Sequence, residues 1–180
     1  MLEAHYAEIL AEVEALDGAN EVYVANTEDA TLVRDGEWLE LRLYDQQADT
    51  WNDANCARLP VTCAILRKIP SLRQSVGGAL LPGVISVFRL LPGSTLVPHT
   101  GPSNVRTTLH LGLQIPREGA TITVGGETRG WKHGEVLAFD DSFVHVAENR
   151  GSTPRTVLLA NVWKPVFCEL HGCQPSTSIL

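Results

Sequence analysis

The sequence lacks the features of a nucleic-acid-binding or membrane-spanning protein. Its 180 residues contain 14 Lys and Arg against 21 Asp and Glu, a formal net charge of −7. Sequence-independent binding to nucleic acid or to anionic lipid needs clustered basic side chains. No apolar run approaches the roughly 18 residues that suggest a membrane span. We therefore expect no nucleic-acid partner and no membrane partner.

Basic residues are also missing where an export signal would carry them. The chain begins with Met1, Leu2 and Glu3, whereas a signal peptide begins with Lys or Arg. Internal repeats and low-complexity stretches are absent, and 44% hydrophobic with 19% charged residues is a globular composition. A chain of this length most simply forms one domain. We predict a cytoplasmic location and leave the oligomeric state open.

The four cysteines lack the spacing of a metal-binding or redox motif. Cys56 and Cys63 are seven positions apart, and Cys168 and Cys173 are five apart, so neither pair is a CxxC motif. Cytoplasmic proteins keep their thiols reduced. We expect four free thiols, with a zinc site completed by His171 as the alternative.

The front part of the chain reads as helical with one strand. Residues 2–16 carry apolar side chains at helical spacing, and Asp17-Gly18 ends this pattern. Residues 38–44 alternate leucine with other side chains, which is typical of a half-buried strand. A second helix is plausible over residues 52–68, where Pro60 must begin or kink part of it.

Beyond Gly77 the pattern changes to short apolar runs separated by Pro-Gly, Gly-Gly and similar turns. The runs cover residues 84–91, 107–115, 120–124, 136–139, 144–147 and 156–162. Several short strands at this spacing indicate an antiparallel sandwich or barrel, of which the jelly roll is one solution.

Three histidines stand out in this β-rich half. His99 follows a turn, His110 lies inside the run 107–115, and His145 follows a polar stretch. Two imidazoles from separate strands can occupy adjacent positions on one iron, zinc or copper ion. Oxygen-activating iron sites usually add a carboxylate two residues after the first histidine, and Gly101 stands there. Spacing alone leaves the metal open, and each histidine could instead be a polar residue on a β surface.

Arg106 and Arg155 lie near these histidines in the sequence. A guanidinium binds a carboxylate through two parallel hydrogen bonds and keeps its charge. Arg155 begins the run 156–159, so its side chain could point into a barrel. The alternative is a solvated arginine at a strand end.

Several longer motifs, in a fixed order over roughly residues 38–165, resemble the aspartyl/asparaginyl β-hydroxylase family. The motifs are Asn55-Cys56-Ala57, Pro60-Val61-Thr62-Cys63, Leu91-Pro92-Gly93, Pro98-His99-Thr100-Gly101-Pro102-Ser103-Asn104, His110-Leu111-Gly112-Leu113, Phe139-Asp140-Asp141-Ser142-Phe143, His145, Arg155 and Val162-Trp163. The resemblance implies a non-haem Fe(II) dioxygenase that uses 2-oxoglutarate and O2.

The implied fold is mainly β, a double-stranded β-helix (jelly roll, cupin-like) with N-terminal helices packed on it. We expect a single domain over residues 1–180. Residues 1–75 would form a cover, residues 76–165 the catalytic core, and residues 166–180 a tail.

The resemblance also assigns the site. His99 and His145 match the two iron ligands of a family that lacks the usual carboxylate, so Gly101 fits. Arg155 matches the arginine that pairs with the distal carboxylate of 2-oxoglutarate, and His110 matches a histidine that contacts this cosubstrate. These assignments make His99, His145 and Arg155 the catalytic set. Two further positions are assigned to cosubstrate binding: Phe88 and Leu90.

The positions on the substrate side depart from the family. Thr108 stands where members that act on aspartyl residues have an arginine, and Arg106 matches another arginine near the substrate carboxylate. Phe88 replaces a serine, and Ser86 replaces a lysine. We predict that the substrate contacts Arg106, Thr108, Ser86 and Trp38 in a less polar pocket.

The expected reaction is hydroxylation of a carbon, of the β type, in an amino acid, a peptide or a small carboxylic-acid biosynthetic intermediate. One alternative is desaturation, cyclisation, epoxidation or rearrangement at the same iron. A second alternative is a non-catalytic jelly roll that binds a carboxylic acid, and a third is a zinc hydrolase.

In lumenal relatives the pair matching Cys56 and Cys63 can form a disulfide, but without an export signal we still expect free thiols.

Overall fold

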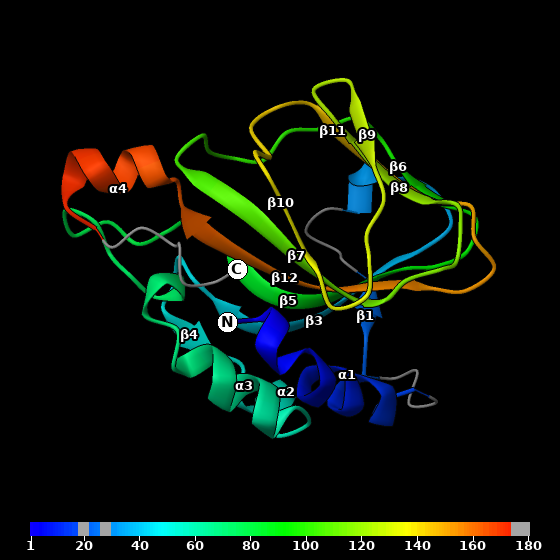
Figure 1. Cartoon of the computed structure of the whole chain (residues 1–180), viewed down its shortest axis with the longest axis horizontal. Helices are drawn as coiled ribbons and strands as arrows, with labels where there is room; N and C mark the ends of the chain where they lie inside the picture. Colours follow the sequence, from blue (N-terminus) through cyan, green and yellow to red (C-terminus); the bar gives the residue numbers. More distant parts are fainter. Residues whose placement is uncertain (18–21, 26–29, 174–180) are drawn as a thin grey trace.

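Two antiparallel β-sheets face each other, and helices cover the outer face of the larger sheet (Figure 1). The structure is a computed structural model that describes residues 1–17, 22–25 and 30–173. The larger sheet has the order β1 (Val24–Ala25), β3 (Trp38–Asp45), β5 (Val84–Leu90), β12 (Arg155–Trp163), β7 (Arg106–Gln114) and β10 (Val136–Phe139), with β4 (Thr50–Trp51) paired to β3. The smaller sheet has the order β2 (Val33–Asp35), β6 (Ser94–Leu96), β11 (His145–Asn149), β8 (Ala120–Val124) and β9 (Glu127–Arg129). The predicted mainly β, double-stranded β-helix fold is confirmed.

The helical elements are short. They are η1 (Glu3–His5), α1 (Tyr6–Ala15), η2 (Ala30–Leu32), α2 (Asp53–Cys56), α3 (Pro60–Arg67), η3 (Pro70–Leu72) and α4 (Pro165–His171). The helix predicted over residues 52–68 is divided, because Pro60 occupies the first turn of α3 and starts a new helix there. Within the described ranges no helix is long and apolar enough to cross a membrane.

Strand alternation separates two hydrophobic cores. On β3, Leu41 and Leu43 point to the outer face and pack with Ile9 of α1 and Leu66 of α3. The opposite face of the same sheet contributes Phe88, which packs in the core between the sheets. Because side chains alternate along a strand, one set of strands serves both cores. The inner face is thereby left for the functional site.

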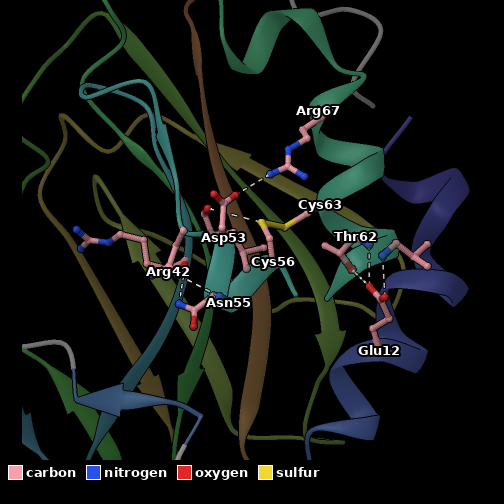
Figure 2. Close-up of a disulfide and its surroundings, with 11 residues drawn as sticks. Glu12, Arg42, Asp53, Asn55, Cys56, Thr62, Cys63 and Arg67 are labelled. Atoms are coloured by element: carbon pink, nitrogen blue, oxygen red, sulfur yellow. Dashed lines mark hydrogen bonds and ion pairs between the residues drawn. A yellow bond between two sulfur atoms is a disulfide. The ribbon is translucent and has the colours of Figure 1, made fainter. Parts of the chain in front are cut away.

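The prediction of free thiols is wrong for both cysteine pairs. Cys56 in α2 forms a disulfide with Cys63 in α3 (Figure 2), and Cys168 in α4 forms one with Cys173. The short break between α2 and α3 brings the first pair to a Cα–Cα distance of 5.6 Å, within disulfide reach. The zinc alternative fails with the free-thiol prediction, since these sulfur atoms are bonded to each other.

Glu12 connects the two covering helices (Figure 2). Its carboxylate accepts hydrogen bonds from the backbone N–H groups of Val61 and Thr62, at 2.8 and 2.7 Å, and from Thr62 Oγ1 at 2.7 Å. These N–H groups belong to the first turn of α3, where they have no partner within the helix. The positive end of the helix dipole also favours a carboxylate there.

Parts of the predicted first helix end and of the predicted tail cannot be compared with the structure. Gly18 and residues 174–180 of the predicted tail lie outside the described residues. The boundaries between cover, core and tail stay a prediction, although β3 of the predicted cover is hydrogen-bonded to β5 within the larger sheet.

Replacing Glu12 with alanine removes the cap of α3 and should lower the free energy of unfolding by about 1–2 kcal/mol. Urea unfolding measures this change. Glu14→Ala is the matched control, because Glu14 is exposed on the same helix. Equal losses in the two variants would show that the contact to α3 contributes nothing.

Alkylation of the denatured protein tests the two disulfides. Without reductant we expect no modified cysteine by mass spectrometry, and after reduction we expect four. Four modified cysteines before reduction would contradict both pairings.

Candidate functional site

A cavity of about 730 Å³ lies between the two sheets. Its wall combines the inner faces of β3, β5, β7 and β12 with side chains of the smaller sheet and of the segment 99–103. Most residues predicted for the site line it. They are Trp38, Phe88, His99, Arg106, Thr108, His110, His145 and Arg155.

His99 and His145 stand side by side in this wall. Their backbones form a bridge, with N–O distances of 3.0 and 2.8 Å, and their ring centroids are 4.2 Å apart. Nδ1 of His99 donates to the carbonyl of Val97 at 2.8 Å, and Nδ1 of His145 donates to that of Phe143 at 2.9 Å. With Nδ1 assigned as the donor, Nε2 of each ring is left with a lone pair, which is the arrangement of metal-binding histidines.

Burial lowers the pKa of His145 below its usual value. The ring is therefore neutral near neutral pH, the form that binds a metal. Among the described residues no group of three or more His, Cys, Asp or Glu side chains converges on one metal position.

The carboxylate of Asp141 lies where the Cβ atom of a side chain at position 101, the usual position of a third, carboxylate ligand, would be. A side chain at Gly101, two residues after His99, would overlap the Asp141 carboxylate. Arg106 holds this carboxylate through Nε at 3.0 Å and Nη2 at 2.5 Å, while its Nη1 donates to the carbonyl of Pro82. Asp141 Oδ1 is buried and has no partner in the part of the chain that the structure describes.

The turn before His145 is shaped by Asp140. Its Oδ1 accepts hydrogen bonds from the backbone N–H and from the hydroxyl of Ser142, at 3.0 and 2.7 Å. Lys164 binds the other oxygen at 2.5 Å. The neighbouring Asp141 faces the cavity instead.

Arg155 is a buried cation at one end of the cavity. It is 2% exposed, and its guanidinium carbon lies 4.5 Å from the centroid of the Trp131 ring. Burial lowers its pKa to about 9, so the group still carries its charge at neutral pH. No hydrogen bond or ion pair joins it to another residue within the described ranges, and its Nε is buried without a partner. A buried charge without a partner is costly, which points to an anionic ligand.

His110 lies near both Arg155 and His145. Trp131 Nε1 donates to its Nδ1 at 3.1 Å, so the hydrogen of the neutral ring is on Nε2. Burial, together with the charges of Arg155 and His145, holds the pKa of His110 well below its usual value. Its Nε2–H is a buried donor without a partner among the described residues.

Two of the predicted site residues do not line the cavity. Ser86 and Leu90 are fully buried, and Ser86 Oγ donates to Glu40 at 2.7 Å. Phe88, between them in β5, lines the cavity and stacks on Trp38 with centroids 5.0 Å apart.

Sequence reasoning missed Glu40 and Arg42, which share the inner face of β3 with Trp38. Period-two alternation from Trp38 would have found both. It also missed Asn161, whose Nδ2 donates to Thr108 Oγ1 at 2.8 Å inside the cavity wall. That contact depends on strand pairing between β7 and β12.

Solved structures with a similar course of the chain include a predicted oxalate decarboxylase from Thermotoga maritima. Its TM-score is 0.45 at 16% sequence identity, and the match covers 79% of this chain and 90% of that one. A cupin-like protein of the same organism has a TM-score of 0.42 at 13% identity, covering 79% and 78%.

Sequence comparison gives closer relatives. The mouse (Mus musculus) aspartyl/asparaginyl beta-hydroxylase is 38% identical over 138 residues, which are 77% of this chain and 18% of that protein. The aspartate beta-hydroxylase domain-containing protein 2 of Xenopus tropicalis is 34% identical over 169 residues, 92% of this chain and 44% of that protein. The chain thus spans less than half the length of either. The model of the aspartyl/asparaginyl beta-hydroxylase family matches residues 3–165, and the chain belongs to this family.

Proposed function

We propose that the protein is an Fe(II)- and 2-oxoglutarate-dependent dioxygenase. Its reaction would hydroxylate a carbon of the β type in an amino acid, a peptide or a small carboxylic-acid intermediate. Membership of a hydroxylase family supports an oxidoreductase that acts on amino-acid residues. The observation that carries the proposal is one cavity that joins a pair of metal-competent histidines to a buried cation without a partner among the described residues, Arg155.

His99 and His145 fit the iron. Both rings present Nε2 because Nδ1 donates to a backbone carbonyl, and these carbonyls fix the orientation of the rings. Fe(II), 2-oxoglutarate and O2, when bound, would supply the oxidant that removes a hydrogen from a substrate carbon.

Arg155 and His110 fit the cosubstrate. The guanidinium of Arg155 would bind the distal carboxylate through parallel hydrogen bonds, with the Trp131 ring holding it in place. The Nε2–H of His110 would donate to a cosubstrate oxygen nearer the iron. Each donor that the fold leaves unpaired here would then gain a partner, which removes the cost of its burial.

The remaining wall is suited to excluding water. Trp38, Phe88, Phe139 and Leu159 line the cavity between its polar groups. An apolar wall keeps bulk water from a reactive oxidant and strengthens the electrostatic contacts inside.

The geometry of the cavity bears differently on the alternative functions. A protein that only binds a carboxylic acid has no use for two histidines that both present Nε2 beside Arg155. Desaturation, cyclisation, epoxidation and rearrangement share the same site, so the substrate pose decides among them.

The cytoplasmic location stays a prediction, and the two disulfides count against it because disulfides persist in oxidising compartments.

Replacing Arg155 with alanine should reduce succinate formation from 2-oxoglutarate at least about 100-fold, because the distal carboxylate loses its charged partner. Arg150→Ala is the control, since Arg150 is exposed and pairs with Glu148 outside the cavity. Near-normal succinate release by the Arg155 variant would refute the assignment.

Removing either histidine should abolish iron chelation. Anaerobic addition of Fe(II) and 2-oxoglutarate to the wild-type protein should produce a weak visible charge-transfer band. His99→Ala and His145→Ala should lose the band, whereas His171→Ala in exposed α4 should keep it. A folded wild-type protein without the band would favour the non-catalytic carboxylate binder.

A further inference from the structure

The cavity has a second charged end, remote from Arg155. Strand register places Arg155 opposite Leu90 and Asp45 opposite Val84. Positions 84 and 90 are the two ends of β5, about 20 Å apart along a strand. Arg42, Asp45 and Arg106 line the cavity at the Val84 end, where Arg106 Nη1 donates to the carbonyl of Pro82.

Each arginine at this end faces a buried carboxylate. Nε and Nη2 of Arg42 donate to the two oxygens of Glu40, at 2.9 and 3.1 Å. Ser86 Oγ also donates to Glu40, at 2.7 Å. Nε and Nη2 of Arg106 both donate to one oxygen of Asp141, Oδ2. Glu40 and Asp141 are each 4% exposed, so their charges are poorly screened and offset the guanidinium charges at close range.

Asp45 adds a further negative charge at the rim. Its Oδ1 accepts the N–H of Ala48 at 2.8 Å and closes the turn after β3. No ion pair joins it to another residue of the described ranges. Among the described residues, the two positive side chains (Arg42, Arg106) and the three negative ones (Glu40, Asp141, Asp45) carry a net charge of −1 at this end.

Helix α2 holds the backbone of Arg42 in place. Asn55 of α2 donates from Nδ2 to the backbone carbonyl of Arg42 at 2.7 Å (Figure 2). The N–H of Asn55 is itself bound by the side chain of Asn52 at 3.0 Å. Arg42 is therefore held from both sides, by Glu40 in the cavity wall and by α2 behind the strand.

We infer that this end of the cavity receives an uncharged or positively charged group of the substrate and rejects a carboxylate. The inference rests on the proposed function and narrows its substrate class to neutral or cationic amino-acid residues. A substrate carboxylate would lose its hydration beside an excess of negative charge, whereas an amide, an alkyl group or an ammonium group would not meet that repulsion. Arg106 then acts as a positioning residue that holds Asp141 next to Gly101, in place of the substrate contact predicted for it.

A panel of N-acetyl amino-acid amides tests the inference on the iron-loaded protein. Succinate formation above the rate without a probe is the readout. We expect the best neutral or cationic probe to exceed the Asp and Glu probes at least tenfold in kcat/KM. An Asp or Glu probe as the best substrate overturns the inference, and so does a panel without any active neutral or cationic member. No succinate at all, with or without probes, overturns the proposed function and this inference with it.

Charge-removing variants identify the source of the selectivity. Asp45→Asn keeps the turn acceptor and should reduce the preference for neutral over Asp probes severalfold, more so at low salt because the rim is exposed to ions. Glu40→Gln should reduce the preference about tenfold. Glu37→Gln, exposed just before β3, removes the same charge outside the cavity and should leave the preference unchanged. If Glu40→Gln does not fold, Asp45→Asn decides alone, and an unchanged preference there overturns the inference.

Discussion

The buried positive charge of Arg155 is the constraint on which the rest of the site depends. A guanidinium that is 2% exposed and has no ion pair with any described residue carries a large desolvation cost. Stacking on Trp131 offsets part of this cost. An anion bound at the guanidinium would remove the rest of this cost. Under the proposed function, the distal carboxylate of 2-oxoglutarate supplies that negative charge.

The rest of the architecture keeps that charge and the histidine pair in register. β12 carries Arg155 in the middle of the larger sheet, between β5 and β7, while His145 comes from β11 of the opposite sheet. The two sheets are held by the apolar core between them. The outer face of the larger sheet is covered by α1 and α3, which Glu12 and the Cys56–Cys63 disulfide secure. A rigid cover allows the inner face to carry polar groups without losing the fold.

Local pattern and the family resemblance predicted much of this site. The apolar runs located the strands, and the motifs around His99, His145 and Arg155 identified residues that the structure brings to one cavity. Two of the missed contacts join segments distant in sequence. The pairing of Arg106 with Asp141 spans 35 positions and that of Ser86 with Glu40 spans 46, so only strand register reveals them. The prediction of free thiols was wrong for a different reason, because it followed from the expected cytoplasmic compartment, while the resemblance pointed to a disulfide only for Cys56 and Cys63.

The central claim is that the Arg155 end of the cavity recognises the distal carboxylate of 2-oxoglutarate. Calorimetric titration of the iron-loaded protein under anaerobic conditions tests it most directly, with 2-oxoglutarate compared to 2-oxopentanoate, which has the same chain length and lacks that carboxylate. We predict that 2-oxoglutarate binds about 100-fold more tightly, as expected for a bidentate, charge-assisted contact in a buried site. Equal dissociation constants for the two acids would contradict the account.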